Sequence, residues 1–240
     1  MPDLISVEEA QKKFELACNE ASGFSLMQNA GASFKAGIIV ANLREALTDE
    51  IMEKFFMPIM NTRVGFLTDR DPKRVNKQGQ STPPYSLDVV RDAIIEGASM
   101  GLLPTFNQMN IIAGKMYPTK EGYGALLKKI GAKHVLNIGM DNSAKDAQFS
   151  EIPVKVSFEY NGEKNTMLIT AVVKKDAYSS YDQLKGKAER RAKKALYEYL
   201  TGIDLGDADT DDGGTNTRTV DAEAVVIDQK EAEAKIRKPL

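Results

Sequence analysis

The chain lacks tryptophan and has only one cysteine and one histidine among its 240 residues. Cys18 therefore has no partner for an internal disulfide, and Cys18 and His134 together are too few to form a zinc site. The single histidine lies in a predicted strand, where it does not fit a serine–histidine–aspartate catalytic set. These absences lead us to expect a protein that is not an enzyme and that binds no metal or other cofactor.

Long hydrophobic runs are also missing. No apolar segment of the sequence approaches the ~20 residues that are needed to span a bilayer. The N-terminal sequence MPDLISVEEA contains acidic residues and no hydrophobic stretch of the kind found in secretory signals. Because hydrophobic residues still make up 42% of the chain, a substantial core can form. We expect a soluble, cytoplasmic protein with no membrane partner.

The net charge of −2 conceals three segments of different charge. Residues 1–109 contain 11 Lys and Arg against 14 Asp and Glu, which gives −3. Residues 110–202 contain 16 against 10, which gives +6, and residues 203–240 contain 5 against 10, which gives −5. A basic segment inside an acidic chain indicates a local surface for a polyanion, although the isoelectric point of the whole chain is about 5.7.

Residues 1–60 are predicted to be helical, and we expect them to make contacts between subunits. Ser6 begins a capping box, and the helix that it opens is expected to break at Ser22 and Gly23. Further helices are predicted at residues 34–47 and after Thr48.

Residues 61–84 contain basic residues together with glycine and proline, which predicts an exposed, mobile loop. A solvated connection is the simpler interpretation of this loop. A contact between the loop and a nucleic-acid groove is the alternative.

Residues 85–202 predict an α+β core. Its first helix, at residues 87–100, ends at Gly101. A hairpin follows, with strands at residues 109–113 and 116–117 and a turn at Gly114 and Lys115. We expect this hairpin to belong to an antiparallel sheet that also contains a three-strand meander.

The rest of the core is predicted to contain a helix, the meander and a last helix. Thr119 caps the first of these helices and Gly131 ends it. Alternating apolar residues and an Asn161-Gly162 turn predict the meander. The expected elements are strands at residues 133–138, 151–160 and 166–173, and a helix at residues 181–200 that ends at Gly202.

Residues 203–240 form an acidic tail. The segment from residue 202 to 217, GIDLGDADTDDGGTNT, has almost nothing to bury and is predicted to be a disordered linker. Residues 220–236 contain helix formers but few large apolar side chains, which predicts a marginal helix that a partner could induce.

The last helix of the core has the densest charge. Between Lys185 and Lys194 it carries six Lys and Arg against one Glu. Four of these cations share a face because they follow the spacing i, i+3, i+4, i+7; they are Lys187, Arg190, Arg191 and Lys194. Phosphates would offset the repulsion among them, whereas a solvated lysine-rich helix is the alternative.

The order of these motifs resembles the RecT/Redβ family of phage single-strand annealing recombinases. The main resemblance is the sequence GASMGLLPTFNQMNIIAGKMYPTKEGYGALLKKIG at residues 97–131. Like the family core, it contains a helix ending in a Gly-Leu-x-Pro turn, an Ile-rich strand, and a Gly-Tyr-Gly helix ending in glycine. Ala192, Lys193 and Lys194 followed by Leu200 fit the family's last helix, so that the resemblance covers about residues 85–202.

This resemblance implies a strand-annealing protein of phage-type homologous recombination and DNA repair, acting in a bacterial host cell. The implied partners are single-stranded DNA, the annealed duplex intermediate and further copies of the chain in a ring or helical filament. An exonuclease or a single-strand-binding protein would bind through the tail.

The candidate nucleic-acid-binding residues come from the hairpin, its helix and the last helix. The first group is Lys115, Tyr117, Lys120, Tyr123, Lys128 and Lys129. The second group is Lys185, Lys187, Arg190, Arg191 and Lys194. Because the chain has no tryptophan, contact with bases would depend on Tyr117 and Tyr123.

Two other interpretations remain open at this stage. Residues 119–200 have the order helix, three strands, helix, which also suits a double-stranded-RNA-binding module. A structural phage protein, whose basic helix packs against acidic neighbours, is the third interpretation.

Overall fold

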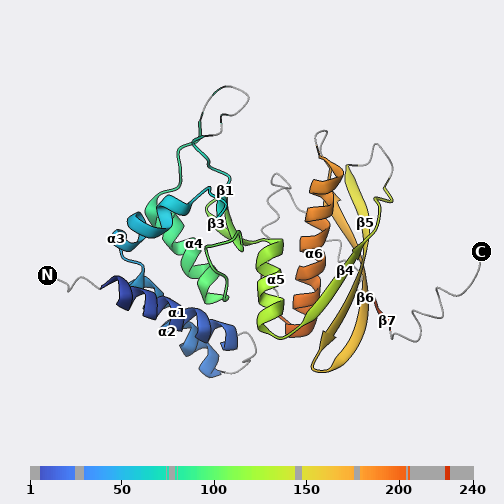
Figure 1. Cartoon of the computed structure of the whole chain (residues 1–240), viewed down its shortest axis with the longest axis horizontal. Coiled ribbons are helices and arrows are strands. Elements are labelled where there is room, and N and C mark those ends of the chain that lie inside the picture. The colour runs from blue at the N-terminus through green and yellow to red at the C-terminus, as the bar shows by residue number, and fades with distance from the viewer. Residues whose placement is uncertain are drawn as a thin grey trace, which may run out of the picture. The chain divides into compact units, whose positions relative to one another are not determined.

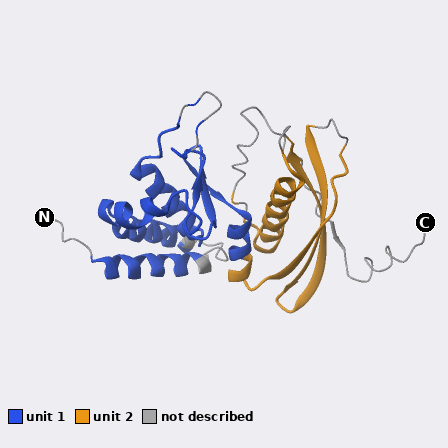
Figure 2. Ribbon diagram, turned by 45° about the horizontal axis from the view of Figure 1, so that its top comes forward, with its two compact units in different colours: residues 1–126 blue, residues 127–240 orange. Residues whose placement is uncertain are grey.

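The computed structural model describes residues 6–24, 30–73, 75, 79, 81–143, 148–175, 179–203, 205 and 225–227. The chain divides into two compact units, unit 1 at residues 1–126 and unit 2 at residues 127–240 (Figure 2). The boundary between the two units falls inside residues 85–202, which were predicted to form a single core. No helix in the described ranges is long and apolar enough to cross a membrane.

Helices form the N-terminal part of unit 1, as predicted (Figure 1). The Glu9 N–H donates to Ser6 Oγ at 3.1 Å, and the Ile51 N–H donates to Thr48 Oγ1 at 3.3 Å, so both predicted caps form. The predicted break at Ser22 and Gly23 is wrong, because α1 continues through both residues. The elements are α1 (Val7–Phe24), α2 (Ala30–Ala46), α3 (Asp49–Ile51), the π-helical turn η1 (Met52–Phe56) and the 3₁₀ turn η2 (Met57–Ile59).

Unit 1 also contains a small three-stranded sheet. Its strands are β1 (Leu67–Thr68), β2 (Met109–Ile112) and β3 (Lys115–Pro118), in the order β1-β2-β3. The turn between β2 and β3 is one residue earlier than predicted, since Ala113 (φ 51°) and Gly114 (φ 77°) occupy its centre. Two consecutive positive φ angles are typical of a type I′ turn, and they leave Lys115 as the first residue of β3.

Helix α4 (Leu87–Ser99) packs against β2, β3 and the N-terminal helices. The inner face of α4 contains Val90, Ala93, Ile94 and Gly97, which are all buried. Gly97 lies so close to β2 that a Cβ atom there would be 2.7 Å from Met109 Sδ. The backbone of α4 therefore packs directly against methionine side chains of the hairpin.

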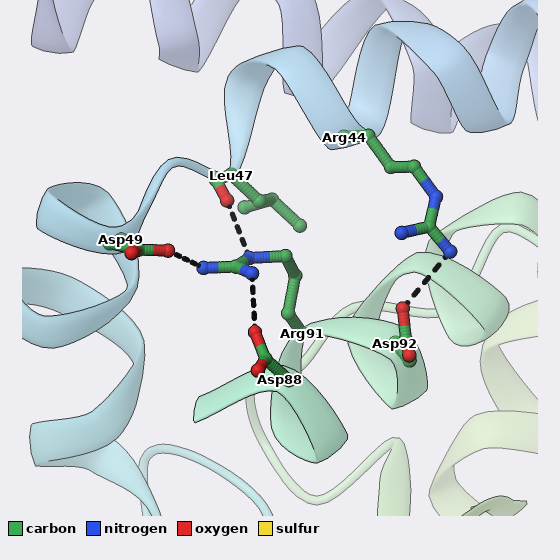
Figure 3. Close-up of polar contacts among 6 residues, drawn as sticks. All are labelled: Arg44, Leu47, Asp49, Asp88, Arg91 and Asp92. Atoms are coloured by element: carbon green, nitrogen blue, oxygen red, sulfur yellow. Dashed lines mark hydrogen bonds and ion pairs between the residues drawn. The ribbon is translucent and has the colours of Figure 1, made fainter. Parts of the chain in front are cut away.

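A largely covered arginine, Arg91, joins α4 to the preceding helices (Figure 3). Arg91 Nε donates to the Leu47 carbonyl at 2.8 Å, just beyond the end of α2. Its two terminal nitrogens bind the carboxylates of Asp49 and Asp88. The Arg91 side chain is only 16% exposed, whereas Arg44, which forms an ion pair with Asp92 nearby, is 59% exposed.

Helix α5 (Lys120–Lys129) begins and ends at the predicted residues. The Gly122 N–H donates to Thr119 Oγ1 at 3.1 Å, which confirms Thr119 as the N-cap. Gly131 adopts φ 80°, and the Gly131 and Ala132 N–H groups bind the last carbonyls of the helix, as in a glycine C-terminal motif.

Unit 2 contains the predicted antiparallel meander, closed on one side by the last helix (Figure 1). Asn161 (φ 52°) and Gly162 (φ 83°) form the predicted tight turn. The hairpin of unit 1 does not join this sheet, so the single sheet expected from the sequence is wrong. The elements are β4 (Lys133–Ile138), β5 (Phe149–Tyr160), β6 (Glu163–Lys174) and α6 (Tyr181–Thr201).

A fourth strand, β7 (Val225–Ile227), pairs with β6 in antiparallel orientation. These three residues lie inside the segment 220–236, where a marginal helix was predicted, and for them that prediction is wrong. Apart from residues 202, 203 and 205, the predicted disordered linker lies outside the described residues.

Asp141 follows β4 and accepts hydrogen bonds from the backbone. Asp141 Oδ1 accepts hydrogen bonds from the Ser143 N–H at 2.9 Å and the Glu151 N–H at 3.1 Å. Lys175 Nζ lies 3.7 Å from Asp141 Oδ2. Burial alone would raise the pKa of Asp141, but the hydrogen bonds, led by the one from Ser143, hold it well below its ordinary value.

This lowered pKa predicts a loss of stability in acid. A carboxylate whose pKa is depressed in the folded state stabilises the protein above its unfolded pKa of about 3.9, and that contribution disappears as the pH falls further. Asp141→Asn keeps an acceptor oxygen but removes the charge, so we expect about 1–2 kcal/mol less stability at neutral pH. Urea unfolding from pH 7 to pH 2.5 should show a smaller acid loss for the variant, and parallel curves would contradict this account.

Candidate nucleic-acid interface

The basic helix α6 has well-formed ends. The Gln183 N–H donates to Ser180 Oγ at 3.3 Å, and Ser180 N–H donates to Gln183 Oε1 at 3.0 Å, which makes a complete capping box. At the other end Gly202 adopts φ 69°. The small residues Ala188 and Ala192 are fully buried in α6, which packs across β4, β5 and β6.

Much of the predicted cationic face of α6 is engaged within the protein. Arg190 is only 8% exposed, and Arg191 donates from Nη1 to the Val172 carbonyl of β6. Lys194, whose side chain is 12% exposed, lies 3.5 Å from Glu198 Oε1. The spacing of these residues is as predicted, but their burial and contacts serve the fold. We therefore assign Arg190, Arg191 and Lys194 chiefly to packing.

The remaining candidates on α6 are at its N-terminal half. Lys185 is exposed and Lys187 is half-buried. Lys193, which was not among the candidate binding residues, forms an ion pair with Glu189 at 2.7 Å. Exposed positive charge on this helix is thus concentrated near Lys185.

His134 is a half-buried residue of β4, as predicted. Burial lowers its pKa, and the charge of Lys193 lowers it further, while Glu189 acts in the opposite direction. The imidazole is therefore neutral at pH 7, so His134 does not add to the positive charge of the unit.

The candidates from the hairpin and α5 differ in exposure. Lys115, Lys128 and Lys129 are exposed, and Lys120 has a side chain that is 40% exposed and 3.8 Å from Glu121 Oε1. Tyr117 is half-buried in β3, opposite Asn110. Tyr123 has no exposed surface, which leaves Tyr117 as the only predicted aromatic candidate that a base can reach.

The structure therefore provides separate groups of exposed cations. Lys115 and Lys120 belong to unit 1, whereas Lys128, Lys129 and Lys185 belong to unit 2. Lys120, Lys128 and Lys129 lie on the same helix, α5. Each of these lysines can attract phosphate through its long, hydrated side chain.

Sequence reasoning missed a hydrogen-bond network at the turn of the hairpin. The Tyr85 hydroxyl donates to Asp69 Oδ1 at 2.7 Å and accepts from the Gly114 N–H at 2.8 Å. Asp69 Oδ2 accepts from the Ala113 N–H at 3.0 Å. Burial raises the pKa of Tyr85, and the hydrogen bond to Asp69 raises it further. The hydroxyl therefore stays protonated at neutral pH and keeps donating to the carboxylate.

No sequence pattern predicts that Asp69 and Tyr85 are neighbours, because residues 70–84 lie between them in the chain. The Arg70 guanidinium carbon lies 4.5 Å from the centre of the Tyr85 ring, so a basic residue of that loop also belongs to this arrangement.

Within the described ranges, no cluster of three or more His, Cys, Asp or Glu side chains could hold a metal ion. Comparisons of the chain with protein-family models, with curated proteins and with solved structures find no match. A proposal for the function therefore has to rest on the residues of this chain and their geometry.

Proposed function

We propose that the chain binds single-stranded DNA by its phosphates and promotes the annealing of complementary strands, without making or breaking covalent bonds. The observation that carries this proposal is the charge of +6 in residues 110–202 together with the exposure of Lys115, Lys128, Lys129 and Lys185. The sequence resemblance to phage annealing proteins supports it. We further propose a homo-oligomeric assembly in phage-type recombination and a protein partner for the tail.

Annealing requires that a strand be held by its backbone while its bases remain available for pairing. Lysine suits this task, because its ammonium group attracts phosphate without requiring a fixed geometry or a particular base. Neutralised phosphates release counterions, so that affinity depends steeply on salt. A site made chiefly of exposed lysines is consistent with binding that does not depend on sequence.

The first test removes three exposed lysines of unit 2 at once. In Lys128→Ala/Lys129→Ala/Lys185→Ala, the slope of log Kd against log salt for a fluorescent oligonucleotide should fall by roughly two units, because each single-strand phosphate contact contributes about 0.7. Annealing of complementary oligonucleotides should slow in parallel. Arg190, Arg191 and Lys194 are unsuitable for this test, since their substitution would also disturb packing.

A matched control removes the same charge from the strands of the unit. Lys133→Ala/Lys155→Ala/Lys164→Ala takes one lysine from each of β4, β5 and β6 and should leave the salt slope nearly unchanged. Equal losses in both triple variants would mean that only net charge matters. Absence of any salt-dependent binding by the unmodified protein would overturn the proposed function.

The order of elements favours a second candidate, a double-stranded-RNA-binding module. Residues 120–201 run helix α5, antiparallel strands β4, β5 and β6, then helix α6, which is the order expected for such a module. Competition between unlabelled single-stranded DNA and an RNA duplex distinguishes the two candidates. Preferential displacement by the duplex would favour the module, and failure to bind either would favour a structural protein.

A further inference from the structure

Asp69 and Tyr85 flank the basic segment at residues 70–84. Through hydrogen bonds they connect both ends of this segment to the turn between β2 and β3. One carboxylate and one hydroxyl connect three parts of the chain: Asp69 directly after β1, Tyr85 two residues before the start of α4, and the turn between β2 and β3. The backbone of the turn supplies two of the donors, so the contact depends on the positions of Ala113 and Gly114 rather than on their side chains.

Arg70, the first residue of the segment, has a fixed backbone. Its carbonyl accepts hydrogen bonds from Thr68 Oγ1 at 2.8 Å and from Asn61 Nδ2 at 3.3 Å. Its N–H donates to the same Thr68 oxygen at 3.2 Å. Because the guanidinium carbon also lies over the Tyr85 ring, 4.5 Å from its centre, the Arg70 side chain is restrained at both ends.

The contact with Tyr85 restrains an arginine that can bind anions. A guanidinium group presents its N–H donors along the edges of its plane, and these match the spacing of two oxygens of a phosphate group. Arg70 is exposed, and the cation–π contact restricts its side chain before binding, which reduces the entropy that is lost on binding.

Two exposed lysines adjoin this arginine along the same connected segments. Lys115 directly follows Gly114, whose N–H is bound by Tyr85. Lys73 lies three residues beyond Arg70, and its N–H donates to Asp71 Oδ1 at 3.0 Å. The Asp69 carboxylate already accepts two hydrogen bonds, one from the Tyr85 hydroxyl and one from the Ala113 N–H.

We propose that Arg70, Lys73 and Lys115 form a second phosphate-binding surface, in unit 1, which Asp69 and Tyr85 position. We call it the hairpin-end surface. It would bind the backbone of single-stranded DNA, and it extends the proposed function to residues 70 and 73, which no candidate set included. Tyr85 and Asp69 act as positioning residues, since they bind the protein backbone and the arginine rather than the DNA.

The direct test removes the three cations and compares them with three others of the same unit. Arg70→Ala/Lys73→Ala/Lys115→Ala should reduce the salt slope for an oligonucleotide by roughly two units. The control Lys12→Ala/Lys35→Ala/Lys54→Ala removes exposed cations from α1, α2 and η1, and should change the slope by less than about half a unit. Thermal melting of each variant verifies that the fold is retained.

The positioning role is tested with Tyr85→Phe, which keeps the ring under Arg70 but removes the hydroxyl. Hydrogen exchange at the Gly114 amide should accelerate, and the salt slope should fall by about one unit as the surface loses its fixed arrangement. Tyr199→Phe, at an exposed tyrosine of α6, is the matched control and should change neither quantity.

The outcomes separate this inference from the proposed function on which it rests. If the unmodified protein binds DNA with a steep salt slope and the Arg70 triple variant retains that slope, the hairpin-end surface is refuted while the function stands. If the unmodified protein shows no salt-dependent binding, the function itself fails. If the Gly114 amide hydrogen exchanges rapidly in Tyr85→Phe while the salt slope stays unchanged, the cations bind DNA but the positioning role is refuted.

Discussion

Gly122→Ala should destabilise unit 1 by about 3 kcal/mol or more, as expected when an atom is forced into a closely packed site. A Cβ atom at Gly122 would lie only 2.0 Å from the Gln108 carbonyl oxygen and 3.1 Å from Leu102 Cδ2. A backbone oxygen cannot move aside as the end of a flexible side chain can. Helix α5 would therefore have to shift away from the segment that leads into β2. Urea unfolding followed by circular dichroism measures the loss.

Gly186→Ala provides the control for this prediction. Gly186 also lies in a helix, α6, but no atom lies within 4 Å of the position that its Cβ would occupy. Alanine there should raise stability by about 0.5–1 kcal/mol, because it restricts the unfolded chain and favours the helix. If both variants were equally stable, the close approach of α5 to Gln108 would be incorrect.

Arg91→Ala should lower the free energy of unfolding by about 1–3 kcal/mol, because the carbonyl of the buried Leu47 loses its donor. The carboxylates of Asp49 and Asp88 add little, since both side chains are at least 80% exposed and water can solvate them. The Leu47 carbonyl at the end of α2 and the Asp49 carboxylate at the start of α3 would both lose this partner (Figure 3). Arg91→Lys should recover only part of the loss, since an ammonium group cannot reproduce the planar arrangement of donors.

Arg44→Ala tests whether the loss of stability is specific to Arg91. Arg44 forms a single ion pair with Asp92 at 3.1 Å, and both side chains are about 60% exposed. Exposed pairs of this kind contribute about 0–1 kcal/mol, so the variant should remain close to the unmodified protein. A loss as large as that of Arg91→Ala would mean that general electrostatics, rather than the hydrogen bonds of Arg91, stabilises α4.

Local sequence signals predicted the elements whose ends depend on a few neighbouring residues. Thr119 and Gly131 mark the ends of α5, and the Asn161-Gly162 turn fixes the register of β5 and β6. In each case the relevant contacts join residues close in the chain. By contrast, β1 has only two residues, too few to show any period, and its parallel pairing with β2 depends on residues far along the chain.

The candidate site was less predictable than the fold, because charge spacing shows which residues share a helix face but not what that face contacts. Arg190 and Arg191 have the predicted spacing, yet one is buried and the other binds a carbonyl of β6. Tyr123 was predicted as a base-stacking residue, but it lies in the core. The sequence offered the basic loop at residues 61–84 as an alternative contact for nucleic acid, but it could not distinguish Arg70 from the other cations, because the contact with Tyr85 joins residues 15 positions apart.

The pairing of β1 also has a consequence for the order of events during synthesis. Helices α1 and α2 pack together, and β4, β5 and β6 pair with their neighbours in the chain, so these contacts can form as soon as each segment emerges. Leu67 instead pairs with Asn110, 43 residues later. Strand β1 must therefore wait for β2, and the hydrogen bonds that the Ala113 and Gly114 N–H groups donate to Asp69 and Tyr85 can form only after the whole of α4 has been made.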